Sequence, residues 1–162
     1  VALAAAAVAF DLRSRRVPNV LTFGAAAVAV VIQGLNGGWP GVAASVLGWL
    51  AGAALFFPLF ALGGMGAGDV KLLAAFGAWL GPVGALWTGL IGALAGGVMA
   101  VVFALTRGYL RTALQNVGGM LRLWRIAGIR PVEGLTLEST ASVRLPYALP
   151  LAVGALATLL SR

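Results

Sequence analysis

Apolar runs separated by short polar or glycine-rich breaks form the dominant pattern of this chain. A helix that crosses a bilayer needs about 20 predominantly apolar residues. The pattern therefore predicts an all-α, polytopic integral membrane protein with about six transmembrane helices. The predicted spans cover residues 1–10, 20–35, 42–62, 69–80, 83–105 and 145–160.

The breaks between the runs contain residues that start or end helices. Pro18 suits the first turn of a helix, where its missing N–H group would have no helical partner in any case. The sequence NGGWPG at 36–41 and the Gly-Pro pair at 81–82 are typical of turns. A glycine-rich segment, 63–68, separates the third run from the fourth.

The opening run is shorter than a full span. Its ten apolar residues precede Asp11, so we interpret them as the end of a helix that starts before Val1. A signal peptide is the alternative, and it fits badly because its charges would precede the apolar run.

The composition is that of a membrane protein. Hydrophobic residues make up 61% of the chain and charged residues only 9%, against about 25% charged in an ordinary soluble domain. We expect one membrane-embedded domain over 1–162, with a core at 1–105, an amphipathic segment at 106–142 and a last helix at 143–162. The absence of cysteine and histidine excludes disulfides, thiolate chemistry and the commonest zinc and haem ligands. We therefore expect no metal and no cofactor.

Basic residues gather in two of the breaks. Nine of the eleven lie either between the first two runs or between the last two. Because basic loops stay on the cytoplasmic side of a membrane, this side is predicted to be cytoplasmic, with both chain ends outside. The same rule accounts for the net charge of +7 without a nucleic-acid partner. The nine residues are Arg13, Arg15, Arg16, Arg107, Arg111, Arg122, Arg125, Arg130 and Arg144.

The segment 107–130 interleaves arginines with leucine, methionine, tryptophan and isoleucine. We expect one or two interfacial helices there, broken at Gly118 and Gly119, with the arginines against the phosphates of anionic lipids. Trp124 and Leu123 would then lie at the acyl boundary. A solvated basic connector is the alternative.

Two of the four acidic residues lie at predicted membrane boundaries, and Glu133 and Glu138 lie in the polar segment. Asp11 ends the first run and Asp69 begins the fourth, both on the cytoplasmic side. Alone, either could cap a helix or pair with an arginine. As a pair they fit an aspartic protease, in which two facing carboxylates share one proton. One carboxylate activates a water and the protonated member hydrogen-bonds the scissile carbonyl.

The sequence GMGAGDVKLL, residues 64–73, surrounds Asp69. Glycine reaches positive φ at little cost and lets another backbone come close, so Gly66 and Gly68 are expected to form a turn that admits an extended peptide. Helix packing is the alternative role for these glycines. Lys71 could pair with Asp69, reach the lipid interface or contact a substrate.

Two motifs together resemble the type IV prepilin leader peptidases, which belong to the G-x-G-D class of membrane aspartyl proteases. The motifs are DLRSRRVPN at 11–19 and GAGDVK at 66–71, and LPYALPLAVGAL at 145–156 resembles the last helix of that family. The resemblance implies that Asp11 and Asp69 are the catalytic pair. It also implies that Gly66 and Gly68 shape the loop, and that Pro18, Asn19 and Lys71 are supporting positions.

The resemblance further implies a substrate and a location. The family cleaves prepilins and pseudopilins, small membrane proteins with a basic leader ahead of an apolar helix, just after a glycine. These subunits build pili and secretion pseudopili, so we expect a prokaryotic inner-membrane protein whose site faces the cytoplasm. With no cysteine-containing region ahead of Asp11, the chain resembles the short, peptidase-only type of Tad/Flp pili. N-methyltransferase activity is therefore not expected.

Two alternatives use the same residues differently. A small proton- or cation-coupled transporter subunit would use Asp11 and Asp69 as an ion site, since acids inside membranes often mark ion paths. A catalytically silent scaffold for pilus assembly would need neither acid.

Overall fold

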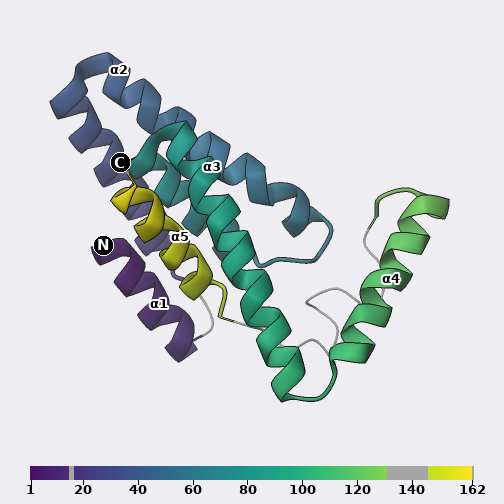
Figure 1. Ribbon diagram of the computed structural model, residues 1–162. Helices are drawn as coiled ribbons and strands as arrows, with labels where there is room; N and C mark the ends of the chain where they lie inside the picture. The colour runs from purple at the N-terminus through teal and green to yellow at the C-terminus, as the bar shows by residue number, and fades with distance from the viewer. Residues whose placement is uncertain (15–16, 131–145, 162) are drawn as a thin grey trace.

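The computed structural model describes residues 1–14, 17–130 and 146–161, and these residues form helices without any β-strand (Figure 1). The predicted all-α fold is confirmed. Two helices of the described ranges, α2 and α3, are long and apolar enough to cross a membrane. The helices are α1 (Ala2–Ser14), α2 (Asn19–Ala61), α3 (Ala67–Thr106), α4 (Leu110–Ala127) and α5 (Ala148–Leu160).

α2 and α3 each break at one glycine. Gly38 (φ 58°, ψ −147°) and Gly81 (φ 67°, ψ −179°) leave helical geometry, and these positive φ angles favour glycine because it has no Cβ. Pro40 and Pro82 follow within two residues, in the first turn of the next helical segment, where proline is tolerated. The breaks lie where the sequence predicts turns. The helix before Gly38 extends beyond residue 35, where the second span was predicted to end.

The chain reverses at both breaks (Figure 1). In α2, a Cβ atom on Gly34 would lie 2.9 Å from Val42 Cγ2 across the break. In α3, a Cβ atom on Gly77 would lie 3.0 Å from Ala85 Cβ. Each of these helices therefore consists of two antiparallel segments, a first segment before the break and a second segment after it.

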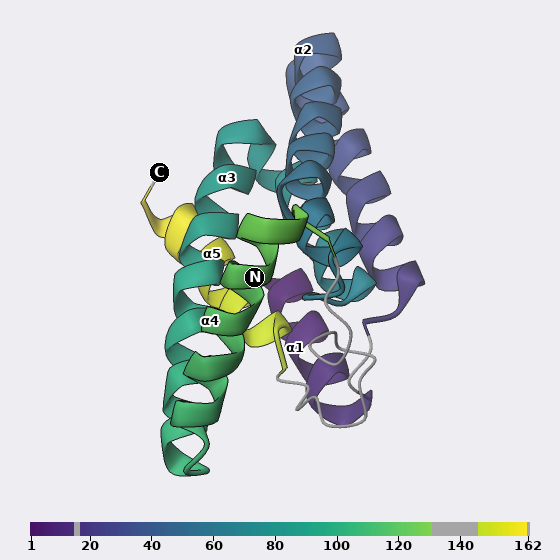
Figure 2. The same cartoon turned by 90° about the vertical axis from the view of Figure 1, so that its right-hand side faces the viewer.

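The first segment of α3 is the centre of the bundle. Every residue from 72 to 78 is buried, and α2 and α5 pack against α3 from different sides (Figures 1 and 2). Glycine permits the closest approach, because the backbones of Gly48 and Gly77 come into contact. A Cβ atom on Gly52 would also lie 2.6 Å from Leu73 O. Small residues bring helices together in this way inside membranes, where apolar side chains gain little by leaving lipid.

Side chains of α2 bind backbone oxygens at the break in α3. The Ala78 carbonyl would accept a helical hydrogen bond from residue 82, but Pro82 has no N–H group. Ser45 Oγ donates to Ala78 O at 2.8 Å, and Gln33 Nε2 donates to Trp79 O at 3.1 Å. Because unpaired backbone groups are costly in an apolar medium, these two bonds stabilise the break and join α2 to α3.

α5 runs antiparallel to the second segment of α3. A Cβ atom on Gly92 would lie 3.0 Å from Leu151 Cδ2, and Thr88 Oγ1 donates to Thr158 Oγ1 at 3.3 Å. α1 lies beside α5 (Figure 1). The start of α5 is thereby placed next to the end of α1.

α4 stands apart from this bundle, with its main contact to α3 (Figure 1). It runs unbroken through Gly118 and Gly119, so the break expected at these glycines is absent. The part of the predicted amphipathic segment at 131–142 lies outside the described residues. Helical periodicity divides α4 into an apolar side and a basic side. The apolar side carries Leu110, Leu114, Val117, Leu121 and Trp124, and the basic side carries Arg111, Gln115 and Arg122. Arg125 lies at the boundary between the two sides, and Leu123 lies away from the apolar side, contrary to the expectation for Leu123.

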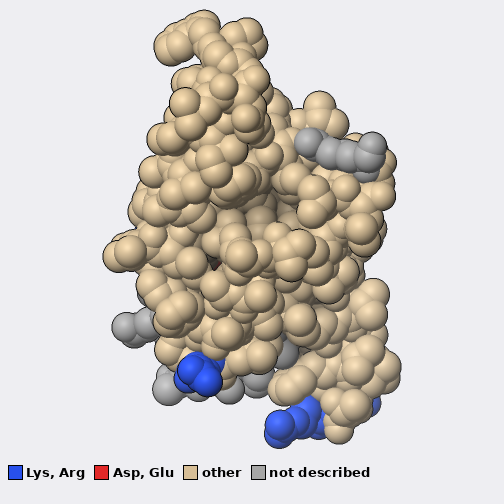
Figure 3. Space-filling model, turned by 90° about the vertical axis from the view of Figure 1, so that its left-hand side faces the viewer, with Lys and Arg blue, Asp and Glu red and all other residues tan. Residues whose placement is uncertain are grey.

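The described basic residues are unevenly distributed over the surface, and the predicted sidedness stays a prediction. Among the described residues on the face drawn in Figure 3, Lys and Arg side chains gather at one end, and the other described residues visible there are uncharged. Arg15, Arg16 and Arg144 lie outside the described residues, as do Glu133 and Glu138.

We predict that Gly48→Ala destabilises the protein. Its Cβ would collide with the Gly77 backbone, which cannot move aside without separating α2 from α3, and overpacking of this kind costs about 1–3 kcal/mol. The check is the thermal unfolding midpoint in detergent. Gly24→Ala is the matched control, because a Cβ atom on this α2 glycine would have nothing within 4 Å. Equal midpoints for the two variants would contradict the packing described here.

Candidate active site

The two aspartates come together from different helices. Asp11 lies in the last turn of α1 and is only 8% exposed. Asp69 lies in the first turn of α3 and is partly buried. Ala7 of α1, Val70 of α3 and Ala148 of α5 belong to one buried cluster, so the two acids lie on helices that pack together, near enough for their charges to interact. Their role as a catalytic pair stays a prediction.

The start of α5 contacts the same site. The Ala148 N–H group donates a buried hydrogen bond to Asp11 Oδ2 at 3.1 Å. The preceding residue, Tyr147, interacts electrostatically with Asp69. Its ring lies edge-on to Phe56 with 6.2 Å between ring centroids, and it packs on Gly96. The site is therefore built from α1, α3 and the first residues of α5.

Sequence reasoning missed Tyr147 and Ala148. The donor at Ala148 is a backbone N–H group, which any residue except proline would supply. The only sequence signal near it is the pair of prolines at 146 and 150, which marks a helix start but names no function. The resemblance covered this stretch without assigning a role to either residue.

Gly66 lies close to the Asp69 carboxyl. The Asp69 N–H group donates to Gly66 O at 3.1 Å, which begins α3. A Cβ atom on Gly66 would lie 3.2 Å from Asp69 Oδ2, so a larger residue would push on the carboxyl. Gly68 has more room, because its Cβ would come no closer than 3.9 Å to Val17. Close packing therefore explains glycine at 66 but not at 68.

The positive φ angle that we expected in this loop lies at Gly63 (φ 74°), before the motif. Gly66 itself is extended, with φ −77° and ψ 145°, a conformation open to other residues. The need for glycine at 66 comes from the nearby carboxyl rather than from its backbone angles.

The predicted supporting residues join α2 to α3 near the acids. Lys71 Nζ donates to Asn19 Oδ1 at 3.0 Å and lies 5.9 Å from the centre of the Phe23 ring. Lys71 therefore joins α3 to α2, which is none of the three roles considered for it. Pro18 is the N-cap of α2 and has extended angles.

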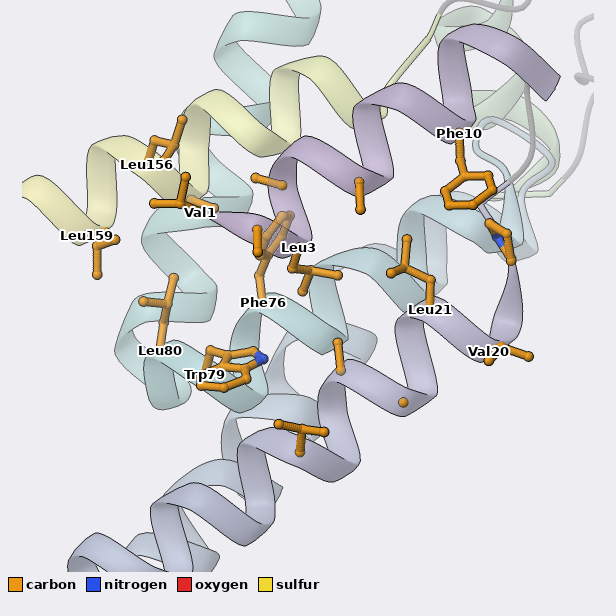
Figure 4. Close-up of a pocket in the computed structure, with 18 residues that line it drawn as sticks. Val1, Leu3, Phe10, Val20, Leu21, Phe76, Trp79, Leu80, Leu156 and Leu159 are labelled. Carbon is orange, nitrogen blue, oxygen red and sulfur yellow. The ribbon is translucent and has the colours of Figure 1, made fainter.

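An apolar groove of about 820 Å³ opens along α1, and neither Asp11 nor Asp69 is among the described residues that line it. Figure 4 shows its labelled side chains, which come from α1, the first segment of α2, the first segment of α3 and α5. Phe10, next to Asp11 in the chain, lies at one end with Val20, and Leu159 lies at the other (Figure 4). None of the described side chains that line the groove is charged.

The chemistry of this site rests on carboxylates. Within the described residues, no group of three or more His, Cys, Asp or Glu residues is placed to hold a metal ion. Two interacting carboxyls can share a proton, and such a pair can serve as base and acid in one reaction. Hydrolysis by an activated water is the reaction class that this pair supports.

Comparison with known proteins identifies a family over the first part of the chain. The sequence model of the type IV leader peptidase family matches residues 1–101. The match includes both aspartates and the whole motif at 64–73, and it ends before α4 and α5. No curated protein and no solved structure gives a significant match.

We predict that Gly96→Val lowers peptidase activity about 10- to 100-fold, because displacement of a site residue by an ångström has effects of this size. A Cβ at this position would lie 2.7 Å from the Tyr147 ring and would push that ring from its place beside the acids. The neighbouring Gly97→Val is the control, since a Cβ there meets nothing within 4 Å. Initial cleavage rates should separate the two variants, and equal rates would show that the Tyr147 position is unimportant.

Proposed function

The chain belongs to the type IV leader peptidase family, and we propose that it is a membrane aspartic endopeptidase that removes the basic leader of prepilins or pseudopilins. The observation that supports the aspartic mechanism is the pairing of Asp11 and Asp69. Both acids lie in the residues that match the family. In line with the resemblance to short Tad/Flp-type members, the proposal includes no N-methyltransferase activity.

In the proposed reaction, one carboxylate is ionised and the other is protonated. The ionised member takes a proton from a water, whose oxygen bonds to the scissile carbonyl carbon. The protonated member hydrogen-bonds the carbonyl oxygen as this atom gains negative charge. When the tetrahedral intermediate collapses, the C–N bond breaks and a proton passes to the leaving nitrogen. The N–H group of Ala148 orients Asp11 through the bond at 3.1 Å.

We also propose how the protein sits in the membrane. Six spans would be α1, the two segments of α2, the two segments of α3, and α5. The acids would then lie at the cytoplasmic boundary of a prokaryotic inner membrane. The breaks at Gly38 and Gly81 support this arrangement because the chain reverses there.

α4 fits the cytoplasmic surface of an anionic membrane. Its apolar side has exposed Leu114, Val117 and Leu121, which the bundle leaves uncovered. It carries three arginines and no acidic residue, so anionic headgroups complement its charge. We propose that this apolar side lies in the acyl boundary and that the arginines bind lipid phosphates.

The catalytic proposal predicts that Asp11→Asn and Asp69→Asn each lower cleavage of a Tad/Flp-type prepilin by roughly 1,000-fold or more, since an amide cannot serve as either proton donor or base here. The assay is release of the leader in liposomes, with folding checked by thermal unfolding. Glu138→Gln, which neutralises a different acid, is the control. Normal cleavage by either aspartate variant would contradict the mechanism. Failure of the wild type to cut any prepilin would contradict the function and direct attention to ion flux.

The membrane arrangement predicts three labelling patterns in single-cysteine variants, which can be made directly because residues 1–162 contain no cysteine. A membrane-impermeant maleimide should label Trp39→Cys in intact cells, since this exposed residue follows the Gly38 break. It should label Gln115→Cys only after the inner membrane is opened. Leu121→Cys should stay protected until detergent removes the lipid. Labelling of Gln115→Cys in intact cells would contradict the orientation, and ready labelling of Leu121→Cys in membranes would contradict the lipid contact of α4.

A further inference from the structure

The two segments of α3 pack in a fixed register about the Gly81 break. A Cβ atom on Gly77 would lie 3.0 Å from Ala85 Cβ. Further along, a Cβ atom on Gly89 would lie 3.2 Å from Leu73 Cδ2. The members of each pair stand the same number of residues before and after Gly81. Because each helical residue advances the chain by about 1.5 Å, positions paired in this way lie at the same depth in the bundle.

The same register makes Gly96 of the second segment level with Gly66, which precedes the first segment. The Asp69 carboxyl is turned back toward Gly66, since a Cβ atom on that glycine would lie 3.2 Å from Asp69 Oδ2. Gly96 therefore lies at the depth of this carboxyl.

Tyr147, the residue before α5, places its hydroxyl at this depth. A Cβ atom on Gly96 would lie 2.8 Å from both Cζ and Oη of Tyr147, so the hydroxyl end of the ring covers Gly96. The ring also packs against the buried cluster that contains Phe56 and Val70. Val70 directly follows Asp69, with which Tyr147 interacts electrostatically. The hydroxyl thus lies at the end of the bundle that carries the acids.

The backbone next to Tyr147 contacts the other acid. The Ala148 N–H group donates to Asp11 Oδ2 at 3.1 Å, so two successive residues adjoin both carboxyls. None of the hydrogen bonds among the described residues uses the Tyr147 hydroxyl. A phenylalanine ring would fill the same space, so packing alone does not account for the oxygen atom, and a partly buried tyrosine hydroxyl usually has a partner. The hydroxyl is therefore available as a donor to a bound substrate.

Resting on the function proposed above, we propose that the Tyr147 hydroxyl is a catalytic group that donates a hydrogen bond to the scissile carbonyl oxygen. This oxygen gains negative charge as the water attacks, and it already receives one hydrogen bond from the protonated carboxyl. A second donor, held in place by the contacts of its ring with Gly96 and Phe56, stabilises that charge further. The hydroxyl keeps its proton throughout, so the bonds made and broken are those of the reaction described above.

Tyr147→Phe tests the hydroxyl, because it removes the oxygen and keeps the ring. We expect kcat for a full-length prepilin in liposomes to fall about 100-fold, the effect of losing one such donor, with KM nearly unchanged. Tyr109→Phe is the matched control. Tyr109 is the other tyrosine of the chain, and its ring lies edge-on to Phe103 with 6.3 Å between ring centroids. This variant should cleave as the wild type does, and thermal unfolding midpoints check that both variants fold.

A second measurement separates a hydrogen bond to the reacting atoms from a packing role. A prepilin peptide with a secondary alcohol in place of the scissile amide carries the oxygen of the tetrahedral intermediate. Its advantage in Kd over the same peptide without the hydroxyl should shrink at least about tenfold in Tyr147→Phe. The peptide without the hydroxyl should bind the wild type and Tyr147→Phe equally.

A normal kcat in Tyr147→Phe would overturn the inference and leave the peptidase intact. Equal loss of affinity for both peptides would also overturn it, because Tyr147 would then serve only in packing. So would a shifted pH–rate profile with an unchanged maximal rate, since the hydroxyl would then act through a carboxyl. A wild type that cleaves no prepilin would refute the proposed function, and this inference with it.

Discussion

The backbone contact between Gly48 of α2 and Gly77 of α3 is the constraint on which the rest of the structure depends. It holds the first segment of α3 at the centre of the bundle, with Asp69 at the start of that segment. Ser45 adds a hydrogen bond to Ala78 O at 2.8 Å. In lipid, where apolar burial alone does not hold helices together, such close contacts and satisfied backbone groups determine the packing.

The candidate site follows from that placement. α3 presents Asp69, α1 presents Asp11, and α5 reaches both through Tyr147 and Ala148. Three parts of the chain that are distant in sequence therefore position one pair of carboxyls. The apolar groove is formed largely by the same helices, so the contacts that bring the acids together also shape the surface beside them.

Much of this arrangement was predictable from sequence, because it is carried by local patterns. Apolar runs indicated the helices, and glycine with proline indicated the breaks at Gly38 and Gly81. The acids were predictable as a pair because so few others exist in the chain. The hydrogen bond from the Ala148 N–H group to Asp11 was not predictable. Every residue except proline has a backbone N–H group, so the residue type does not reveal such a donor. The groove was not predictable either, because its shape depends on the separation of α1 from α2.

The most direct test of the central claim uses a prepilin peptide whose scissile amide is replaced by a secondary alcohol. Such a group resembles the tetrahedral intermediate, and analogues of this kind bind about 100-fold or more tighter than substrates. The account predicts that the hydroxyl improves the Kd of the wild type by this factor over the same peptide without it. The improvement should vanish in Asp11→Asn and in Asp69→Asn alike. Equal Kd values with and without the hydroxyl in the wild type would contradict a two-aspartate site.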